Sequence, residues 1–281
     1  QMDAWRWIVA DAKAAGATMA VQLNHAGRKA STGCFSIGYE HESVPEEQGG
    51  WQTVGPSANA FGPLDKPREL TVDEIHAIVD QFRDAAWRAY DIGFDAVEIH
   101  AAHGYLLSQF LDPLINERED EYGGSFDNRI RILVEVVDAV RSVIPDTMPV
   151  LVRVSATDWA AGGWDLDQTV NLAKVLKKHG VDLMDVSTGG MIPGVTIPVK
   201  PDYQVPFAEQ VRSRAEIPTT AVGLITKPKQ AKKILKSGAA DAIEIGRAAL
   251  RDPNWPLRAA HKLGIPTEDA PYQPQYVRGA Y

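Results

Sequence analysis

The feature that most constrains the fold is a repeated unit in which an amphipathic helix runs into a glycine and then a short apolar strand. The unit ends in IGFDAVEI (92–99), HGVDLMDV (179–186) and SGAADAIEI (237–245). A strand that is apolar on both faces and alternates with helices belongs to a parallel sheet, because the helical crossovers cover it. The repeat therefore predicts an α/β fold built from βα units.

Six strands can be placed in this way, and each is expected to be apolar on both faces. They span 18–23, 94–100, 149–155, 181–187, 218–223 and 240–246. Helices are expected over 1–13, 71–92, 128–144, 166–179, 205–215, 227–237 and 248–263. The second of these begins with Thr71 and Glu74, the spacing of a capping box, and Gly93 ends it.

A (β/α)₈ TIM barrel fits this series best, and a doubly wound sheet is the alternative. None of the strands leads into the G-x-G-x-x-G turn typical of doubly wound dinucleotide-binding folds. Six strands are two fewer than a closed barrel needs. The chain also opens at Gln1 inside a helical pattern. We therefore expect one barrel domain over 1–281 whose first two βα units, on the order of 80 residues, lie upstream.

The segment 24–68 is rich in Gly, Pro and Ser, and we expect it to be a long loop that caps the barrel.

The composition of the chain argues against several other classes of function. A net charge of −8 without a basic run argues against a nucleic-acid groove. No apolar run approaches the ~18 residues of a membrane span, and no secretory signal is visible.

Cys34 is the single cysteine. It excludes a disulfide framework and a zinc or iron–sulfur site held by several cysteines of this chain. Cytoplasmic localisation is the resulting expectation.

The carboxyl ends of the strands carry the candidate functional residues, because the chemistry of a barrel gathers at that end. In chain order they are Gln22, His100, His103, Tyr105, Arg153, residues 187–190, Gly223, Gly246 and Arg247. The last strand places Gly246 and Arg247 where a helix begins, and Gly223 ends the strand before it. A glycine lets a ligand approach the backbone, and an arginine pairs with phosphate. This pattern predicts a phosphate site, with a capped helix and a surface arginine as the alternative.

Arg153 interrupts an apolar strand, so it must be paired inside the fold. It is either a cation beside a ligand that accumulates negative charge or the partner of Glu98, Asp185 or Glu244, and both can hold at once. The amide of Gln22 can donate and accept, which suits the edge of a flat heterocycle such as a flavin pyrimidine ring.

His100, His103 and Tyr105 follow one strand within six residues. Both imidazoles could donate to one substrate oxygen while the phenol supplies a proton. Paired histidines are also common metal ligands. However, H-x-H, H-E-x-x-H and a second cysteine are lacking, so no metal is expected. A histidine pair satisfied within the core is the remaining alternative.

Four stretches resemble the Old Yellow Enzyme family of flavin-dependent ene-reductases: QLNHAGRKAS (22–31), VEIHAAHGYLLSQFLDPLINEREDEYGGSFDNRIR (97–131), VRVSATDW (152–159) and AIEIGRAALRDP (242–253). The closing QYVRGAY (275–281) resembles the bacterial class III subgroup, which is of the thermophilic and xenobiotic reductase type.

The resemblance implies a TIM barrel that holds FMN non-covalently and takes hydride from NADPH or NADH. Gln22 would bind the flavin pyrimidine, Arg153 would lie against the N1–O2 region, and Gly223, Gly246 and Arg247 would bind the phosphate. His100 and His103 would bind the activating group of an enone, enal, nitroalkene or maleimide, and Tyr105 would protonate the alkene carbon.

In this subgroup the arginine matching Arg278 reaches into a neighbouring subunit's site, which implies a homodimer or homotetramer. Two other functions are weighed. An FMN-dependent dienoyl-CoA reductase or amine dehydrogenase would need an iron–sulfur domain, which the single cysteine and the C-terminus soon after the last barrel helix disfavour. A non-catalytic flavin- or phosphate-binding barrel would not need Tyr105 with both histidines.

Overall fold

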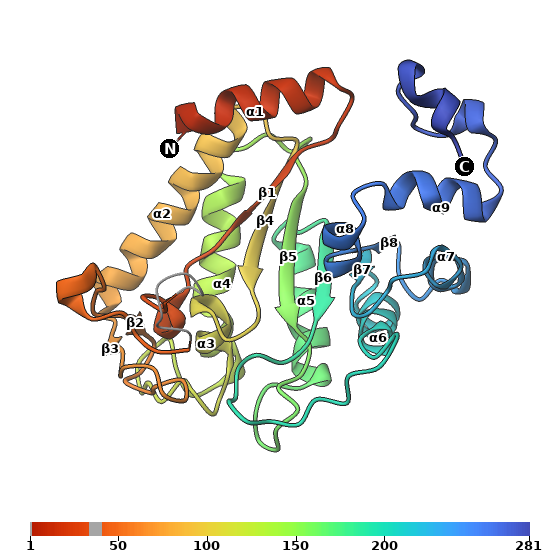
Figure 1. The fold of residues 1–281 in the computed structure, drawn as a ribbon. Helices are drawn as coiled ribbons and strands as arrows, with labels where there is room; N and C mark the ends of the chain where they lie inside the picture. Colours follow the sequence, from red (N-terminus) through yellow and green to blue (C-terminus); the bar gives the residue numbers. More distant parts are fainter. Residues whose placement is uncertain (1, 34–40) are drawn as a thin grey trace.

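Six strands form one parallel sheet in the computed structural model, which describes residues 2–33 and 41–281 (Figure 1). The strands are β1 (Ala20–Leu23), β4 (Ala96–Ala101), β5 (Val150–Ser155), β6 (Leu183–Ser187), β7 (Thr219–Ala221) and β8 (Ala242–Ile243). The helices are α1 (Met2–Ala14), α2 (Val72–Asp91), α3 (Leu106–Leu111), α4 (Phe126–Arg141), α5 (Leu166–Lys178), α6 (Val205–Ala215), α7 (Pro228–Ser237), α8 (Arg247–Arg251) and α9 (Trp255–Leu263). Cys34 lies outside the described residues.

The order of the strands decides between the two α/β architectures. Every strand of this sheet pairs with the strand that comes next along the chain, in the order β1-β4-β5-β6-β7-β8. A doubly wound sheet reverses its strand order at a switch point, whereas a barrel does not. The series is therefore of the barrel type, as predicted. That two further βα units lie upstream stays a prediction.

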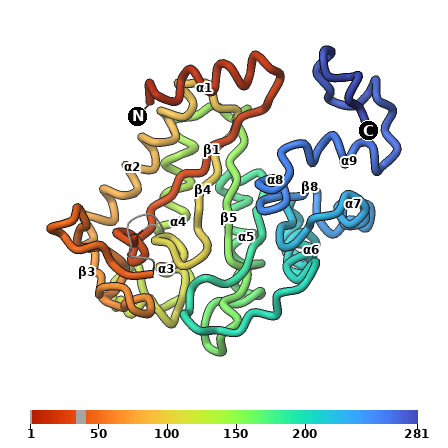
Figure 2. Tube along the Cα trace, in the orientation of Figure 1, coloured from red at the N-terminus to blue at the C-terminus, as the bar shows by residue number. Residues whose placement is uncertain are grey.

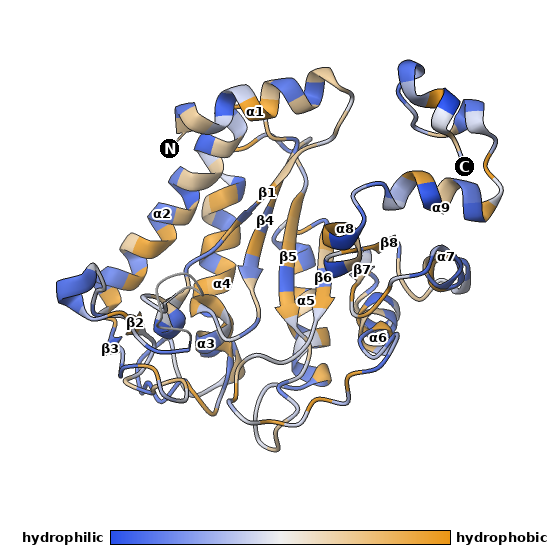
Figure 3. Cartoon of the chain, viewed as in Figure 1, coloured by the Kyte–Doolittle hydropathy of each residue, from blue (hydrophilic) through white to orange (hydrophobic). Residues whose placement is uncertain are grey.

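Helix α2 shows how the sequence sets an element and its packing. The Glu74 backbone N–H donates to Thr71 Oγ1 at 3.2 Å, and the Thr71 N–H donates to Glu74 Oε2 at 2.9 Å, which confirms the predicted capping box. Ile75 and Phe82 lie on the buried face. Figure 3 shows the resulting alternation of apolar and polar residues along the helix.

The two faces of the sheet differ in chemistry. The alternating residues Val97, Ile99, Val150, Val152, Val154, Met184 and Val186 belong to the apolar core between the strands and the helices. The residues between them include Glu98, Arg153 and Asp185, whose side chains meet on the opposite face, and His100, which stands opposite Arg153 in the strand register. The expectation of strands that are apolar on both faces is therefore wrong, because the alternation places one polar layer inside the curved sheet.

The C-terminal elements are shorter than predicted. Strand β8 pairs with β7 only through Ala242 and Ile243, so Glu244 to Gly246 are not part of the strand. The closing helix is divided into α8 and α9. Asp252 precedes Pro253 and adopts φ −144° and ψ 88°, because a residue before proline is disfavoured in the helical region.

The segment 24–68 contains short elements in its described parts: the 3₁₀ helices η1 (Gly27–Lys29) and η2 (Glu46–Gln48), and the two paired strands β2 (Val54–Gly55) and β3 (Arg68–Glu69). Of these elements, η1 and β2 contact α3, at the end of the sheet where β4 and β5 finish (Figures 1 and 2). Its role as a cap of the barrel stays a prediction.

Arg28 ties this segment to the β6–α6 loop. Its side chain is buried, and its guanidinium donates to the Asn59 backbone oxygen at 3.2 Å, to Asn59 Oδ1 at 3.0 Å, to the Ala60 oxygen at 3.3 Å and to the Met191 oxygen at 2.7 Å.

Among the helices of the described chain, none has the length and apolar character of a membrane span.

Candidate active site

The turn between β4 and α3 brings the two histidines and Tyr105 together, as the sequence predicted. His100 Nε2 lies 3.2 Å from His103 Nδ1, and the ring centroids of His100 and Tyr105 are 5.0 Å apart. His103 and Gly104 have φ values of +58° and +73°, and this pair of left-handed residues bends the chain sharply after the strand. The three side chains thus come from the end of β4 and the turn that follows it.

A chain of hydrogen bonds fixes the protons of the histidine pair. The Ala102 backbone N–H donates to His100 Nδ1 at 3.2 Å, so the remaining imidazole proton of neutral His100 resides on Nε2. That N–H donates to His103 Nδ1, and His103 Nε2–H therefore faces Ser187 Oγ at 2.7 Å. A substrate oxygen that displaced either acceptor would meet an imidazole N–H.

The histidines are neutral near pH 7. Burial, and then the positive charge of Arg153, lower the pKa of His100 to about 4. Burial, followed by His100, Arg153 and Lys29, lowers the pKa of His103 to about 3. The pair therefore offers hydrogen bonds without a positive charge, which favours polarising a substrate oxygen over binding an anion.

Lys29 supports this turn, and the sequence analysis missed it. Its ammonium donates to the His103 backbone oxygen at 2.8 Å and to the Gly190 oxygen, and it lies 3.8 Å from the ring centroid of Phe61. Burial, and then Arg28, lower the pKa of Lys29 to about 8. The motif QLNHAGRKAS contains Lys29, but nothing in its spacing indicates that it would span two strand ends.

Arg153 lies inside the sheet among acidic residues. Its Nε is 2.8 Å from Asp185 Oδ2 and its Nη2 is 3.5 Å from Glu244 Oε2, which confirms the predicted ion pairs with these two residues. Gln22 Nε2 donates to Glu98 Oε1 at 2.5 Å, so the structure places Gln22 in the same polar layer. The flavin contacts of Gln22 and Arg153 stay predictions.

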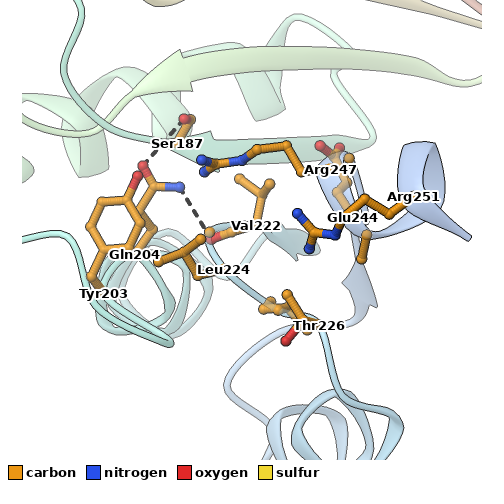
Figure 4. A pocket seen from close by; sticks show the side chains of 13 residues that line it. Ser187, Tyr203, Gln204, Val222, Leu224, Thr226, Glu244, Arg247 and Arg251 are labelled. Atoms are coloured by element: carbon orange, nitrogen blue, oxygen red, sulfur yellow. Dashed lines mark hydrogen bonds between the residues drawn. The ribbon is translucent and has the colours of Figure 1, made fainter.

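Gly223, Gly246 and Arg247 line one cavity of about 220 Å³ (Figure 4). The structure thus brings the three predicted phosphate residues together, and it adds Arg251, which the sequence analysis missed although it follows Arg247 at the i, i+4 spacing of one helix face. Among the described residues, neither arginine forms an ion pair with a carboxylate.

Arg278 is not near this site in its own chain. It lies in the 3₁₀ helix η4 (Pro274–Gly279), is exposed, and belongs to the C-terminal arm, which in Figure 1 projects away from the segment 24–68 and from α3. Its predicted contact with a neighbouring subunit stays a prediction.

The sequence pattern of the NADH:flavin oxidoreductase / NADH oxidase family matches residues 1–265. The chain belongs to this family. It is an FMN-dependent oxidoreductase of the Old Yellow Enzyme type, which confirms the family predicted from the sequence. The class III assignment stays a prediction.

Proteins and solved structures that are similar to this flavin oxidoreductase support the family assignment. The NADPH dehydrogenase of Geobacillus thermodenitrificans (strain NG80-2) is 47% identical over 265 residues, which are 94% of this chain and 71% of that protein. The structure of morphinone reductase in complex with tetrahydroNAD has a TM-score of 0.73 at 32% identity and covers 95% of this chain and 71% of its own. A 2-naphthoyl-CoA reductase complex has a TM-score of 0.82 at 25% identity, with 96% of this chain and 41% of that chain covered.

The described residues fit the cofactor of this oxidoreductase family. A phosphate monoester needs cationic and N–H donors, and the cavity beside Gly246 offers two guanidiniums without carboxylate partners. A Cβ built on Gly246 would meet no atom within 4 Å, so the backbone there is open to a ligand. The side chain of Arg153 is 22% exposed, so the described residues do not enclose it fully.

Proposed function

We propose that this oxidoreductase reduces the C=C bond of activated alkenes such as enones, enals, nitroalkenes and maleimides, with NADPH or NADH as the reductant. The observation that carries the proposal is the hydrogen-bonded pair of neutral imidazoles with the Tyr105 ring against it. In the balanced reaction, the alkene takes a hydride and a proton while NADPH becomes NADP⁺. Bound FMN would supply the chemistry that carries the hydride from the nicotinamide to the alkene.

The residues of this chain would act on the substrate and on the proton. His100 and His103 would donate hydrogen bonds to the carbonyl or nitro oxygen, so that negative charge develops on oxygen rather than on carbon. Tyr105 would transfer its hydroxyl proton to the α-carbon. Gly223, Gly246 and Arg247 would hold the phosphate of FMN, Gln22 its pyrimidine ring, and Arg153 the region where the reduced flavin is negative.

We extend the proposal to the class III subgroup and to a homodimer or homotetramer in which Arg278 reaches a neighbouring site. The support is the C-terminal QYVRGAY motif, the exposed position of Arg278 and the identity to bacterial NADPH dehydrogenases. Size-exclusion chromatography with light scattering tests the assembly. A monomer at working concentrations would contradict it.

Anaerobic spectroscopy of the FMN-loaded protein tests the reaction. NADPH should bleach the flavin absorbance, and 2-cyclohexenone should restore it. His100→Ala should slow the restoration but leave bleaching intact, and Tyr105→Phe should slow it by loss of the proton donor. His179→Ala, which changes a partly exposed histidine paired with Asp138 on the outer helices, is the matched control.

The outcomes separate the candidate functions. Bleaching that no alkene reverses would favour a flavin-binding or diaphorase role over alkene reduction. Restoration by an unsaturated acyl-CoA but not by 2-cyclohexenone would favour the dienoyl-CoA reductase alternative. Wild-type rates of restoration in His100→Ala would contradict the role assigned to the histidine pair.

A further inference from the structure

One cation lies among three carboxylates on the polar face of the sheet. The carboxylate oxygens of Glu98, Asp185 and Glu244 all lie within 4.8 Å of one another, and Arg153 contacts Asp185 at 2.8 Å and Glu244 at 3.5 Å. We call these three acids the acidic cluster. Asp185 is fully buried, with a side-chain exposure of 0%.

Strand register creates this arrangement. Arg153 on β5 stands opposite Asp185 on β6, and Asp185 stands opposite Thr220 on β7. Thr220 Oγ1 lies 2.9 Å from Asp185 Oδ1 and 3.3 Å from Glu244 Oε1, so its single hydroxyl can donate to only one of the two acids at a time. Strand register therefore positions Asp185, whereas Glu244 directly follows β8, and Asp185 in turn forms an ion pair with the Nε edge of Arg153.

The charges of this layer do not balance when all its groups are ionised. Three carboxylates and one guanidinium would sum to −2, with Asp185 fully buried among them. Burial, and then repulsion from Glu244, raise the pKa of Asp185 to about 8, and burial raises the pKa of Glu98. The acidic cluster therefore retains a proton at neutral pH and releases it in mildly alkaline solution.

Polar and charged side chains from the neighbouring elements surround the acidic cluster. Gln22 from β1 binds Glu98, and His100 from β4 is neutral near pH 7. Arg247 and Arg251 line the cavity that Glu244 also lines. Of these groups, Asp185 is the one whose pKa, about 8, lies between pH 6 and pH 9.

We propose that the acidic cluster is a proton-exchanging counter-charge to Arg153, with Asp185 as the positioning residue, and that loss of its proton lowers the reduction potential of the bound flavin. This inference rests on the proposed placement of Arg153 beside the flavin. A protonated cluster leaves more of the guanidinium's positive charge to stabilise the anionic reduced flavin. An ionised cluster offsets that charge and repels the added electrons.

The test is the potential of the FMN-loaded protein, measured by spectroscopic redox titration from pH 6 to 9 in wild type and in Asp185→Asn. The amide keeps an acceptor for Arg153 but cannot ionise. At pH 6 the two proteins should have nearly the same potential. At pH 9 the variant should favour reduced over oxidised FMN about tenfold more than wild type, which is about 30 mV for a two-electron couple.

Two variants complete the experiment. Asp167→Asn removes the same charge from the outer helix α5, where the side chain is 76% exposed, and should leave the potential unchanged. If Asp185→Asn does not fold, Glu98→Gln provides the same comparison from β4. If the flavin binds, either of two results would overturn the proposal: the same difference in potential between variant and wild type at every pH, or no difference at pH 9. A wild-type protein that binds no FMN would instead overturn the proposed function and this inference with it.

Discussion

Gly190→Ala should displace the histidine turn. A Cβ built on Gly190 would lie 2.8 Å from His103 Cα and 2.9 Å from the His103 backbone oxygen. Carbon atoms in ordinary contact are ~3.5–4.0 Å apart, so one backbone must move by roughly 1 Å. Lys29 donates to the carbonyl oxygens of both His103 and Gly190 and resists their separation.

A matched control in the same loop separates the two causes of the lost stability, which are the left-handed backbone and the steric clash. Gly190 has φ +88° and Gly194 has φ +74°, so an alanine at either position carries the left-handed penalty of about 1–2 kcal/mol. A Cβ on Gly194 would meet nothing within 4 Å. Only Gly190→Ala should therefore lose a further ~1–3 kcal/mol through overpacking.

Activity should separate the two variants more clearly than stability. A misplacement of about 1 Å in a catalytic group can lower a rate by about 100-fold. We expect that loss in the restoration of the flavin by 2-cyclohexenone for Gly190→Ala, followed by stopped-flow, with bleaching by NADPH retained. Gly194→Ala should stay within a few-fold of wild type. Equal urea midpoints and equal alkene rates in the two variants would refute the steric argument.

Two further predictions concern buried ionisable groups. Lys29→Met should lower the free energy of unfolding by about 1.5–3 kcal/mol, because hydrogen bonds from a charged donor are lost, and it should also slow alkene reduction. Urea unfolding and stopped-flow measure the two effects, and wild-type values would contradict the role of Lys29 in supporting the histidine turn. Burial, and then Asp112, raise the pKa of Asp158 to about 9. The folded protein thus holds a proton that the unfolded chain releases near pH ~4, so stability should fall as pH rises between those values. Asp158→Asn should flatten that fall in urea titrations, and an unchanged slope would contradict it.

Sequence reasoning reached the fold because its evidence is local. Helix α6 was expected over 205–215 and has those bounds, and the capping box of α2 is present as expected. The error over the faces of the strands arose from treating Arg153 as an interruption of one apolar strand, with Glu98 and Asp185 only as its possible partners. They are one polar layer, and the period of two that places them there is visible only when neighbouring strands are aligned.

The candidate site was predictable where one motif supplies it. His100 lies at the end of β4 and His103 and Tyr105 in the turn after it, so their proximity follows from chain order. Lys29 contacts the His103 and Gly190 oxygens from 74 and 161 residues away in sequence, and no spacing rule relates such positions. The same holds for the side chains that surround Arg153, whose contacts depend on strand register.

The bonds of Arg28 have a consequence for protein engineering. One buried guanidinium holds Asn59, Ala60 and Met191, so Arg28 links the described part of the segment 24–68 to the β6–α6 loop by hydrogen bonds. Grafting only one of them from a relative would leave an unsolvated cation facing foreign carbonyls. Chimaeras designed to change substrate range should therefore exchange both stretches at once, with the arginine and its receiving backbone drawn from the same parent.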